Sequence, residues 1–423
     1  MKDYKLSKIK FGILRYQKLI IASIIVGFLS ALLSDGLKKL TEHYEEIFFG
    51  ATKTNWLFNL LFPVFGLTII YFLRHFLFKN KQNKGIKEIF ETIKTRHNEL
   101  PIYKIPSHFI NGLLTVVFGG SSGIEVSTVV ASATIGSVAQ KKDYTLKGLK
   151  TELICAGVAA GITALFNSPV AGILFAIEVI SKKISPTFII STTLAVATAF
   201  GFTYIMHDEP LFILGITTWH TYALPYIILL GVIAGLNSVY MTKSVLFFKR
   251  VFSKFRTNTK KIVIGSLILS AATLAFPQLY GDGYHSVKEL LLNSQHAPLT
   301  LSFAFTLVGV LILKPLVTSA TLAAGGDGGV FGPSLLLGAF LGLFMAAFLN
   351  TFFSLHVIPV NFMAIGMAAV LSASVHAPFT AIFLVCGIIG NYILFIPILI
   401  ACLISKLTAK MVFPFTVYSY NGK

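Results

Sequence analysis

The chain has 423 residues, of which 55% are hydrophobic and only 12% are charged, and its mean hydropathy is +0.78. About a quarter of the residues of a soluble domain are charged, so this composition predicts a membrane protein and excludes a soluble enzyme, a nucleic-acid factor and a disordered scaffold. The net charge of +18 gathers in short stretches between apolar runs, a distribution typical of cytoplasmic loops. These stretches are 1–18, 74–104, 141–150, 182–183, 249–261 and 406–423.

Long and short apolar runs follow one another along the chain. Eight runs approach the length of about 20 residues that spans a bilayer: 17–34, 56–78, 187–206, 223–248, 262–276, 300–320, 335–354 and 390–405. The first follows a basic start without a small-residue cleavage site, so we expect a retained helix and not a signal peptide. Six shorter runs are broken by Gly, Pro or Ser: 107–118, 124–139, 153–165, 167–181, 358–372 and 377–389. Half-length helices are tolerated in membranes where they line a cavity or are buried in protein, which favours a transport protein.

An internal repeat divides the chain. GVAAGITALFNSPVAGILF (157–175) aligns without a gap with GMAAVLSASVHAPFTAIFL (366–384), and GGSSGIEVS (119–127) aligns with GGDGGVFGP (325–333). The sequence therefore predicts one transmembrane domain over 1–423, built from homologous halves at about 10–205 and 220–410. The basic loops alternate sides so that each half has an odd number of crossings, and we expect inverted topology with a site at the midplane.

The two glycine-rich loops are the candidate site. Each precedes an apolar helix, whose first N–H groups lack partners and carry the positive end of the helix dipole. Two such helix starts facing each other would cradle an anion, while the alternative is tight helix packing through glycine. Glu125 lies at one of these starts, and an intramembrane carboxylate indicates function unless it only caps the helix. Asp327, in the other loop, is expected to cap that loop.

These features resemble the CLC family of chloride channels and chloride/proton exchangers over nearly the whole chain. Four segments carry the resemblance. The first, Gly123-Ile124-Glu125-Val126-Ser127, keeps the glutamate of the family's GREGP loop but not its Arg, second Gly or Pro, and the second, Gly329-Val330-Phe331-Gly332-Pro333, is an intact GxFxP loop. The third, 166–178, matches the stretch after the gate, and the fourth, Pro414-Phe415-Thr416-Val417-Tyr418-Ser419, matches the segment that bears the pore tyrosine.

The resemblance implies an all-α fold of many tilted and half-length helices, and a homodimer with one separate pore per subunit. It implies transport of chloride or another small inorganic anion, with protons as a second partner, and no enzyme activity, cofactor, metal or nucleic acid. Glu125 would be the gate. The implied anion-binding residues are Lys84, Gly85, Ile86, Gly123, Ile124, Glu125, Gly329, Val330, Phe331 and Tyr418. We expect a multi-pass protein of a bacterial inner membrane, with the basic loops in the cytoplasm and without a cytoplasmic regulatory domain.

Two departures from the family pattern bear on function. Lys84, in Asn83-Lys84-Gly85-Ile86-Lys87, stands where the family's GSGIP loop has its anion-binding serine. Its ammonium would either attract the anion or extend to the cytoplasm and leave the site to backbone amides. Val179 stands where exchangers carry an internal proton-transfer glutamate, next to Glu178. Valine cannot carry a proton, so we expect a passive, acid-activated chloride conductance, with chloride/proton antiport as the alternative.

Two other classes of function remain as alternatives. Residues 119–123 fit the GxSxG pattern of hydrolases, but the pattern is weak in a loop rich in Gly and Ser, and no His or Asp context accompanies it. A secondary transporter of another, organic anion is the second alternative. A cradle built from glycine loops is narrow, which favours small inorganic anions.

Overall fold

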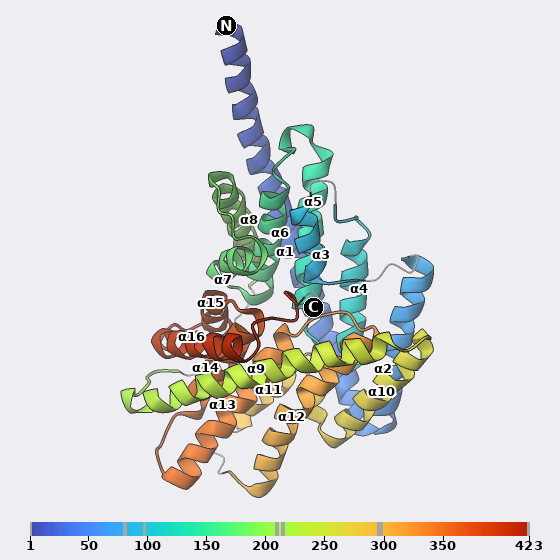
Figure 1. The fold of residues 1–423 in the computed structure, drawn as a ribbon, viewed down its shortest axis with the longest axis vertical. Helices are drawn as coiled ribbons and strands as arrows, with labels where there is room; N and C mark the ends of the chain where they lie inside the picture. The colour runs from blue at the N-terminus through green and yellow to red at the C-terminus, as the bar shows by residue number, and fades with distance from the viewer. Residues whose placement is uncertain are drawn as a thin grey trace.

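Helices make up the fold (Figure 1). The computed structural model describes residues 2–78, 83–95, 99–207, 211–212, 216–293 and 299–420. Up to residue 207 the helices are α1 (Lys2–Thr54), α2 (Leu57–Phe72), η1 (Leu73–Leu77), α3 (Ile86–Lys94), α4 (Lys104–Val117), α5 (Glu125–Lys142), η2 (Tyr144–Leu146), α6 (Lys150–Phe166), α7 (Pro169–Phe175), η3 (Ala176–Ile180) and α8 (Pro186–Ile205). From residue 216 they are η4 (Thr221–Ala223), α9 (Leu224–Ser253), α10 (Asn258–Ala275), η5 (Pro277–Leu279), α11 (Tyr284–Asn293), α12 (Leu301–Ala324), α13 (Phe331–Phe353), α14 (Pro359–Val375), α15 (Pro378–Ile388) and α16 (Phe395–Val412).

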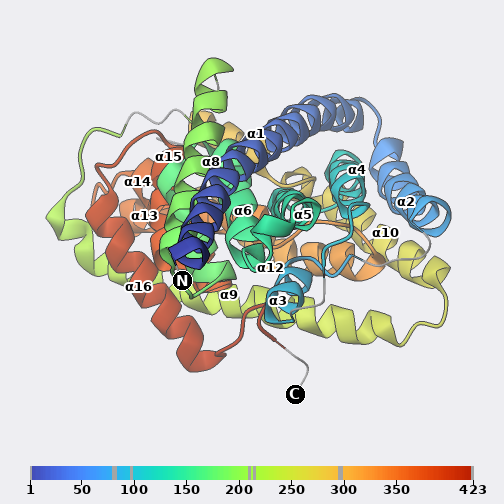
Figure 2. The ribbon, with the colours of Figure 1, turned by 90° about the horizontal axis from the view of Figure 1, so that it is seen from above.

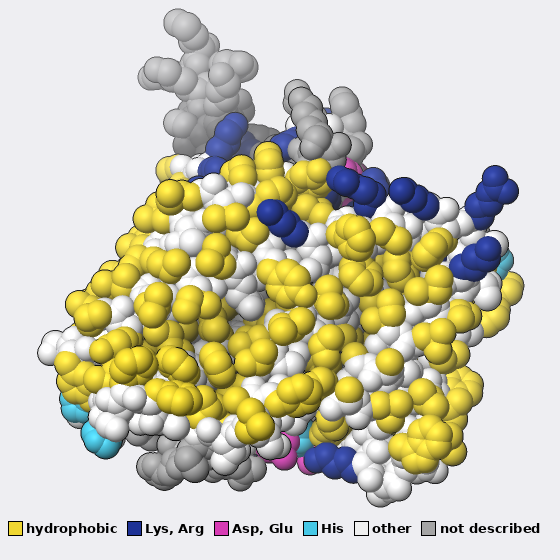
Figure 3. Space-filling model, turned by 60° about the horizontal axis from the view of Figure 1, so that its bottom comes forward, with side chains coloured by type: hydrophobic (Ala, Val, Ile, Leu, Met, Phe, Trp, Pro, Cys, Tyr) yellow, Lys and Arg dark blue, Asp and Glu magenta, His cyan; other side chains and the backbone are white. Residues whose placement is uncertain are grey.

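Several helices are long and apolar enough to cross a membrane. In the described part of the chain there are seven: Gly12–Thr54, Leu57–Leu77, Pro186–Ile205, Thr221–Ser253, Leu301–Ala324, Phe331–Phe353 and Phe395–Val412. One face of the molecule is a broad apolar surface, and most of the Lys and Arg visible on it lie toward its upper edge (Figure 3). The multi-pass membrane fold expected from the sequence is therefore confirmed.

The helix bounds repeat at the spacing of the predicted halves. The helices α6, α7 and α8 begin at 150, 169 and 186, and α14, α15 and α16 begin 209 residues later, at 359, 378 and 395. Asn167 and His376, which follow α6 and α14, both adopt the left-handed conformation, with φ of 50° and 57°. In Figure 1, α5, α6 and α8 lie in the upper part of the view, and α9, α12 and α13 lie in the lower part.

Close helix pairs occupy matching places in the two halves. On α6, Gly157 lies against the backbone of Ser132 on α5, and a Cβ atom there would clash with that backbone. On α14, Gly366 lies against Gly338 on α13 in the same way. Small residues allow helix backbones to approach closely in membranes. These two pairs form the interior of the fold, and most of α5, α6, α13 and α14 is buried.

Three helices differ from the sequence expectation. The first helix continues past 17–34 to Thr54, because Leu37, Thr41 and Glu45 recur every fourth residue on a buried face. Figure 2 shows this helix running obliquely across the molecule, past α8 and α6. The helices α3 and α11 were not expected as separate elements. They are short and only partly apolar, so they lack the signal of a membrane run.

Candidate functional site

Two glycines join the two predicted loops. The N–H of Gly123 donates to the carbonyl of Gly329 at 3.1 Å, and the N–H of Gly329 donates to the carbonyl of Gly123 at 3.0 Å. Next to this bridge, α5 begins at Glu125 and α13 begins at Phe331. The glycines are needed for the close approach, because a Cβ atom on Gly123 would overlap Glu125 and one on Gly329 would overlap Val126. Two helix N-termini therefore face one small region, an arrangement that can bind an anion.

The residues around the bridge are buried. Ile124 and Val330 precede the two helices and are 3% and 1% exposed. Phe331 is 2% exposed, and its ring stacks on Phe166 with 5.8 Å between centroids. The N–H groups at the first turn of a helix have no partner within that helix. The starts of α5 and α13 therefore present backbone donors in a region that side chains seal from solvent.

Glu125 occupies the region between the two helix starts. Its side chain is 1% exposed and folds back over Gly123 toward the backbone N–H of Gly332 on α13. One carboxylate oxygen, Oε1, accepts a hydrogen bond of 2.5 Å from the hydroxyl of Tyr284, while Oε2 has no hydrogen-bond partner among the described residues. The carboxylate thus stands where an anion attracted by the two helix starts would stand.

Tyr418 reaches the same region from the C-terminal segment. It is 9% exposed, and its hydroxyl lies 3.1 Å from the point where a Cβ atom on Gly329 would stand. Among the described residues this hydroxyl has no hydrogen-bond partner. The N–H groups of Tyr418 and Ser419 both donate to Thr416 Oγ1, which fixes the turn that carries the ring. A buried hydroxyl without a partner is rare in proteins, and it is suited to a ligand that accepts a hydrogen bond.

The structure brings Gly85 and Ile86 close to α5 but turns the Lys84 side chain away. At the start of α3, Gly85 has a φ of +64° and lies against Val126. The Lys84 side chain is 62% exposed, and its ammonium lies 3.6 Å from the carboxylate of Glu91. Of the two alternatives for Lys84, the observed conformation corresponds to the one in which the ammonium extends away from the site.

A cluster of charged and polar side chains, which the sequence did not predict, surrounds the buried Asp327 carboxylate. The carboxylate lies 3.2 Å from Nδ1 of His108 and 3.9 Å from the guanidinium of Arg74, and it accepts a hydrogen bond from the amide of Asn83. The N–H of Asp327 donates to Thr115 Oγ1 at 2.9 Å. Asp327 thus ties its own loop to η1, to α4 and to the segment before α3, a larger role than the loop cap that was expected. The features of the sequence that could have indicated this cluster are a His and an Arg beside apolar runs.

Glu178 and Val179 lie away from these contacts. The N–H and hydroxyl of Thr380 donate to Glu178 Oε2 at 2.7 and 2.8 Å, so Glu178 caps the start of α15. Val179 is a partly buried apolar side chain packed against the core. Position 179 therefore offers no group that could carry a proton.

The loop serines make structural hydrogen bonds. Ser121 Oγ lies 3.1 Å from Thr318 Oγ1, and the Ser122 hydroxyl donates to the carbonyl of Asp327 at 3.1 Å. No His contacts Ser121 in the hydrogen bonds of the described residues, which is not the arrangement of a hydrolase nucleophile. The described residues also hold no group of three or more His, Cys, Asp or Glu that could bind a metal.

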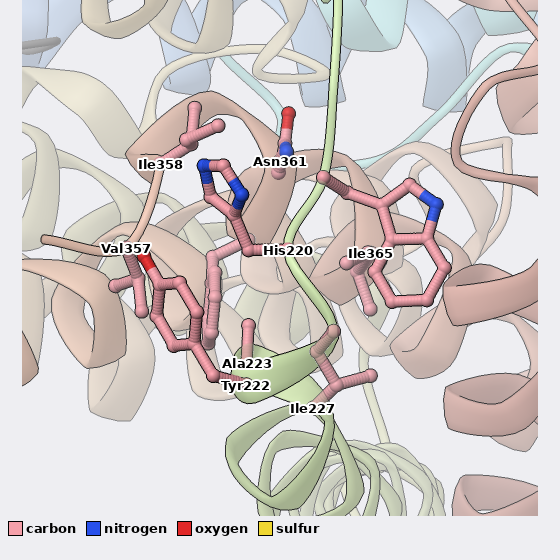
Figure 4. Close-up of a pocket in the computed structure, with 10 residues that line it drawn as sticks. His220, Tyr222, Ala223, Ile227, Val357, Ile358, Asn361 and Ile365 are labelled. Atoms are coloured by element: carbon pink, nitrogen blue, oxygen red, sulfur yellow. The ribbon is translucent and has the colours of Figure 1, made fainter. Parts of the chain in front are cut away.

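A separate pocket lies between the start of α9 and α14 (Figure 4). His220, Tyr222 and Asn361 line it together with apolar side chains. The Tyr222 hydroxyl donates to the His356 carbonyl, and the Asn361 amide donates to the Thr218 carbonyl. None of the lining residues belongs to the region around Glu125, so this pocket is not part of the candidate site.

Comparison with known proteins identifies the family. The family model described as "Voltage gated chloride channel" matches residues 65–410. A putative chloride channel protein ClcB-like of Ralstonia nicotianae is 27% identical over 380 residues, which cover 86% of this chain and 85% of the relative. An H(+)/Cl(-) exchange transporter ClcA of Cronobacter sakazakii is 29% identical over 386 residues, covering 86% and 79%.

A solved structure shows the same fold. The crystal structure of a slow cyanobacterial Cl-/H+ antiporter has a TM-score of 0.79 with this chain at 20% identity, and the alignment covers 95% of this chain and 96% of the other. The expected all-α fold is therefore confirmed. Because the family match covers most of the sequence, the chain belongs to the CLC family of voltage-gated chloride channels and related transporters, an anion-transport family and not a class of enzymes.

Proposed function

We propose that this chain exchanges chloride for protons across a membrane, with Glu125 as the gate and the proton carrier of the anion site. The observation that carries the proposal is the Glu125 carboxylate, which is buried between two helix starts. An ionised carboxylate there would compete with chloride for the same donors. Protonation removes its charge and lets an anion take the position.

Exchange is a better-supported proposal than the passive conductance that Val179 favoured. The ClcA relative, which aligns with 86% of this chain, is named as an H(+)/Cl(-) exchange transporter. Val179 excludes a side-chain proton carrier at that one position, but water between Glu125 and the face that bears the basic loops could carry the proton there. Passive conductance stays as the second candidate, because Val179 favours it and the ClcB-like relative is named as a putative chloride channel.

The anion would be held mainly by backbone. The N–H groups at the starts of α5 and α13 and the free hydroxyl of Tyr418 converge beside Gly329. Gly85 and Ile86 would add the start of α3. Because the donors lie close together in an enclosed, buried region, we propose chloride or another small inorganic anion as the substrate.

The proposed environment is a bacterial inner membrane with the basic loops in the cytoplasm. The concentration of most visible Lys and Arg side chains toward one edge of the apolar face supports this orientation (Figure 3). We also propose a homodimer through the outer faces of α8 and α16, where Ile189, Ile396 and Leu403 are exposed apolar side chains. Cross-linking in mild detergent should give a dimer, and a monomer alone would count against it.

Reconstitution into liposomes tests exchange directly. With a chloride gradient and the membrane potential clamped, the wild-type protein should drive protons against their gradient. Glu125→Gln should keep chloride flux but abolish proton movement and the dependence of flux on pH. Glu178→Gln is the matched control, because it neutralises another carboxylate of an apolar segment that only caps α15; it should remain coupled. Chloride flux without uphill proton movement in the wild type would reject exchange in favour of passive conductance.

A further inference from the structure

Tyr284 makes a direct contact with the proposed gate. Its hydroxyl donates a hydrogen bond of 2.5 Å to Glu125 Oε1, and it is the one side chain among the described residues that donates to that carboxylate. Tyr284 is the first residue of α11, which lies outside both glycine-rich loops and outside the segments that align between the two halves. The sequence motifs did not predict a role for Tyr284.

A buried lysine fixes the turn that leads into Tyr284. The ammonium of Lys314 on α12 is fully buried and donates to the carbonyls of Leu279 at 3.3 Å and Gly281 at 3.0 Å. Burying an ammonium is costly unless it is hydrogen-bonded, so these two carbonyls are held firmly. Gly281 has a φ of +59°, a left-handed conformation that lets the chain turn around the ammonium.

Two carboxylates complete the support of this turn. Asp282 is 3% exposed, and its Oδ1 accepts the N–H of Tyr284 at 2.9 Å, which fixes the start of α11. Glu45 on α1 is 7% exposed and lies against Gly281. The turn is therefore enclosed by ionisable side chains from α1 and α12, and the Tyr284 hydroxyl that follows it contacts Glu125.

We propose that Tyr284 is a positioning residue that holds the ionised Glu125 carboxylate in the anion path, and that Lys314 and Asp282 fix the turn that presents it. This inference rests on the proposed function of Glu125 as the gate. A hydroxyl that donates to a carboxylate stabilises its charged form more than its protonated form. Opening the anion path then requires this hydrogen bond to break, so Tyr284 sets the pH at which the gate opens.

Other ionisable groups surround the pair and are common to every variant compared below. Asp282 in the turn and Glu42 on α1 lie near Tyr284, and Tyr418 in the C-terminal segment lies near Glu125. Lys314 on α12 and Glu45 on α1 lie one step further away, beside Asp282. Substituting Tyr284 alone leaves all of them in place, so a change in the pH profile reports on the hydrogen bond to Glu125.

Tyr284→Phe is the direct test. Chloride efflux from liposomes is measured between pH 4 and pH 8, which is roughly the range in which buried carboxyl groups titrate in proteins. The variant should show more flux at neutral pH, and the midpoint of its pH profile should move to higher pH by about one unit. Tyr280→Phe is the matched control. Its hydroxyl, four residues earlier, donates to the carbonyl of Val117 at 2.7 Å and makes no contact with Glu125, so its midpoint should stay that of the wild type.

A double variant assigns the effect to Glu125. Tyr284→Phe should change nothing when it is added to Glu125→Gln, because the charged carboxylate that the hydroxyl stabilises is then absent. A shift that persists in the double variant, or a Tyr284→Phe midpoint equal to that of the wild type, would overturn the inference. If Glu125→Gln itself kept its pH dependence, the proposed function of Glu125 would fail first, so the two failures are distinguishable.

A further substitution covers the case in which Tyr284→Phe does not fold. 3-Fluorotyrosine installed in place of Tyr284 keeps the ring and the hydroxyl but makes the hydroxyl a stronger donor. The pH midpoint should then move down instead of up. A midpoint that stays at the wild-type value in folded protein would overturn the positioning role.

Discussion

Gly123 and Gly329 occupy equivalent places in the two aligned loops, 206 residues apart, and they pair with each other through two backbone hydrogen bonds. Their bridge is antiparallel, so the chain runs in opposite directions through two equivalent residues. A local two-fold axis between two homologous halves has this consequence. The pairing is therefore the one expected of two homologous halves that meet at the proposed site.

Gly329→Ala should abolish anion transport while leaving a folded protein. A Cβ atom would enter Val126 and approach the Tyr418 hydroxyl, which forces the helix starts apart at a cost of about 1–3 kcal/mol. Chloride efflux from liposomes measures the loss, and size-exclusion chromatography checks the fold. Gly201→Ala on α8 is the matched control, because a Cβ atom there meets nothing within 4 Å. Flux equal to that of the control would show that the close approach is not needed.

Tyr418→Phe should weaken anion binding without unfolding the protein. It removes a buried hydroxyl that has no other hydrogen-bond partner among the described residues, and a hydrogen bond to a charged group contributes about 1.5–3 kcal/mol. Calorimetric titration with chloride should therefore show affinity lower by about tenfold or more. Tyr222→Phe, whose hydroxyl donates to the carbonyl of His356, is the control. An unchanged chloride affinity would reduce Tyr418 to a packing residue.

The sequence predicted the parts of the site that depend on local pattern. Glycine-led helix starts, Glu125 and Tyr418 belong to short motifs, and the structure brings them together around Gly329. Tyr284 and Lys314 could not be predicted in the same way, because their roles come from contacts between segments distant in the chain. For Lys314, the sequence feature that could have indicated a role is that it is the single lysine within the apolar run 300–320.

Asp327→Asn should destabilise the protein more than a surface substitution does. It leaves His108 buried, and Arg74 with 17% of its side chain exposed, without their carboxylate, and breaking a largely buried ion pair costs up to about 3–5 kcal/mol. The apparent midpoint of thermal unfolding in detergent should fall clearly below that of the wild type. Glu91→Gln, which breaks the exposed pair with Lys84, is the control and should change the midpoint little. Equal midpoints for the two variants would show that the Asp327 cluster contributes nothing to stability.

Lys84→Ser tests whether a residue aligned with an anion-binding position acts there. From the sequence, the ammonium could either attract the anion or extend to the cytoplasm. The structure pairs it with Glu91 at 3.6 Å with 62% of the side chain exposed, and such a pair contributes at most about 1 kcal/mol. We therefore expect Lys84→Ser to keep the wild-type chloride affinity and the wild-type pH midpoint of flux.

Gly85→Ala is the informative companion to Lys84→Ser. Gly85 has a φ of +64° and lies against Val126, so a Cβ atom there strains the start of α3 beside α5. If backbone donors of α3 complete the anion site, Gly85→Ala should lower chloride affinity while Lys84→Ser does not. The reverse result, with Lys84→Ser lowering affinity and shifting the pH midpoint, would mean that the ammonium turns inward when an anion is bound.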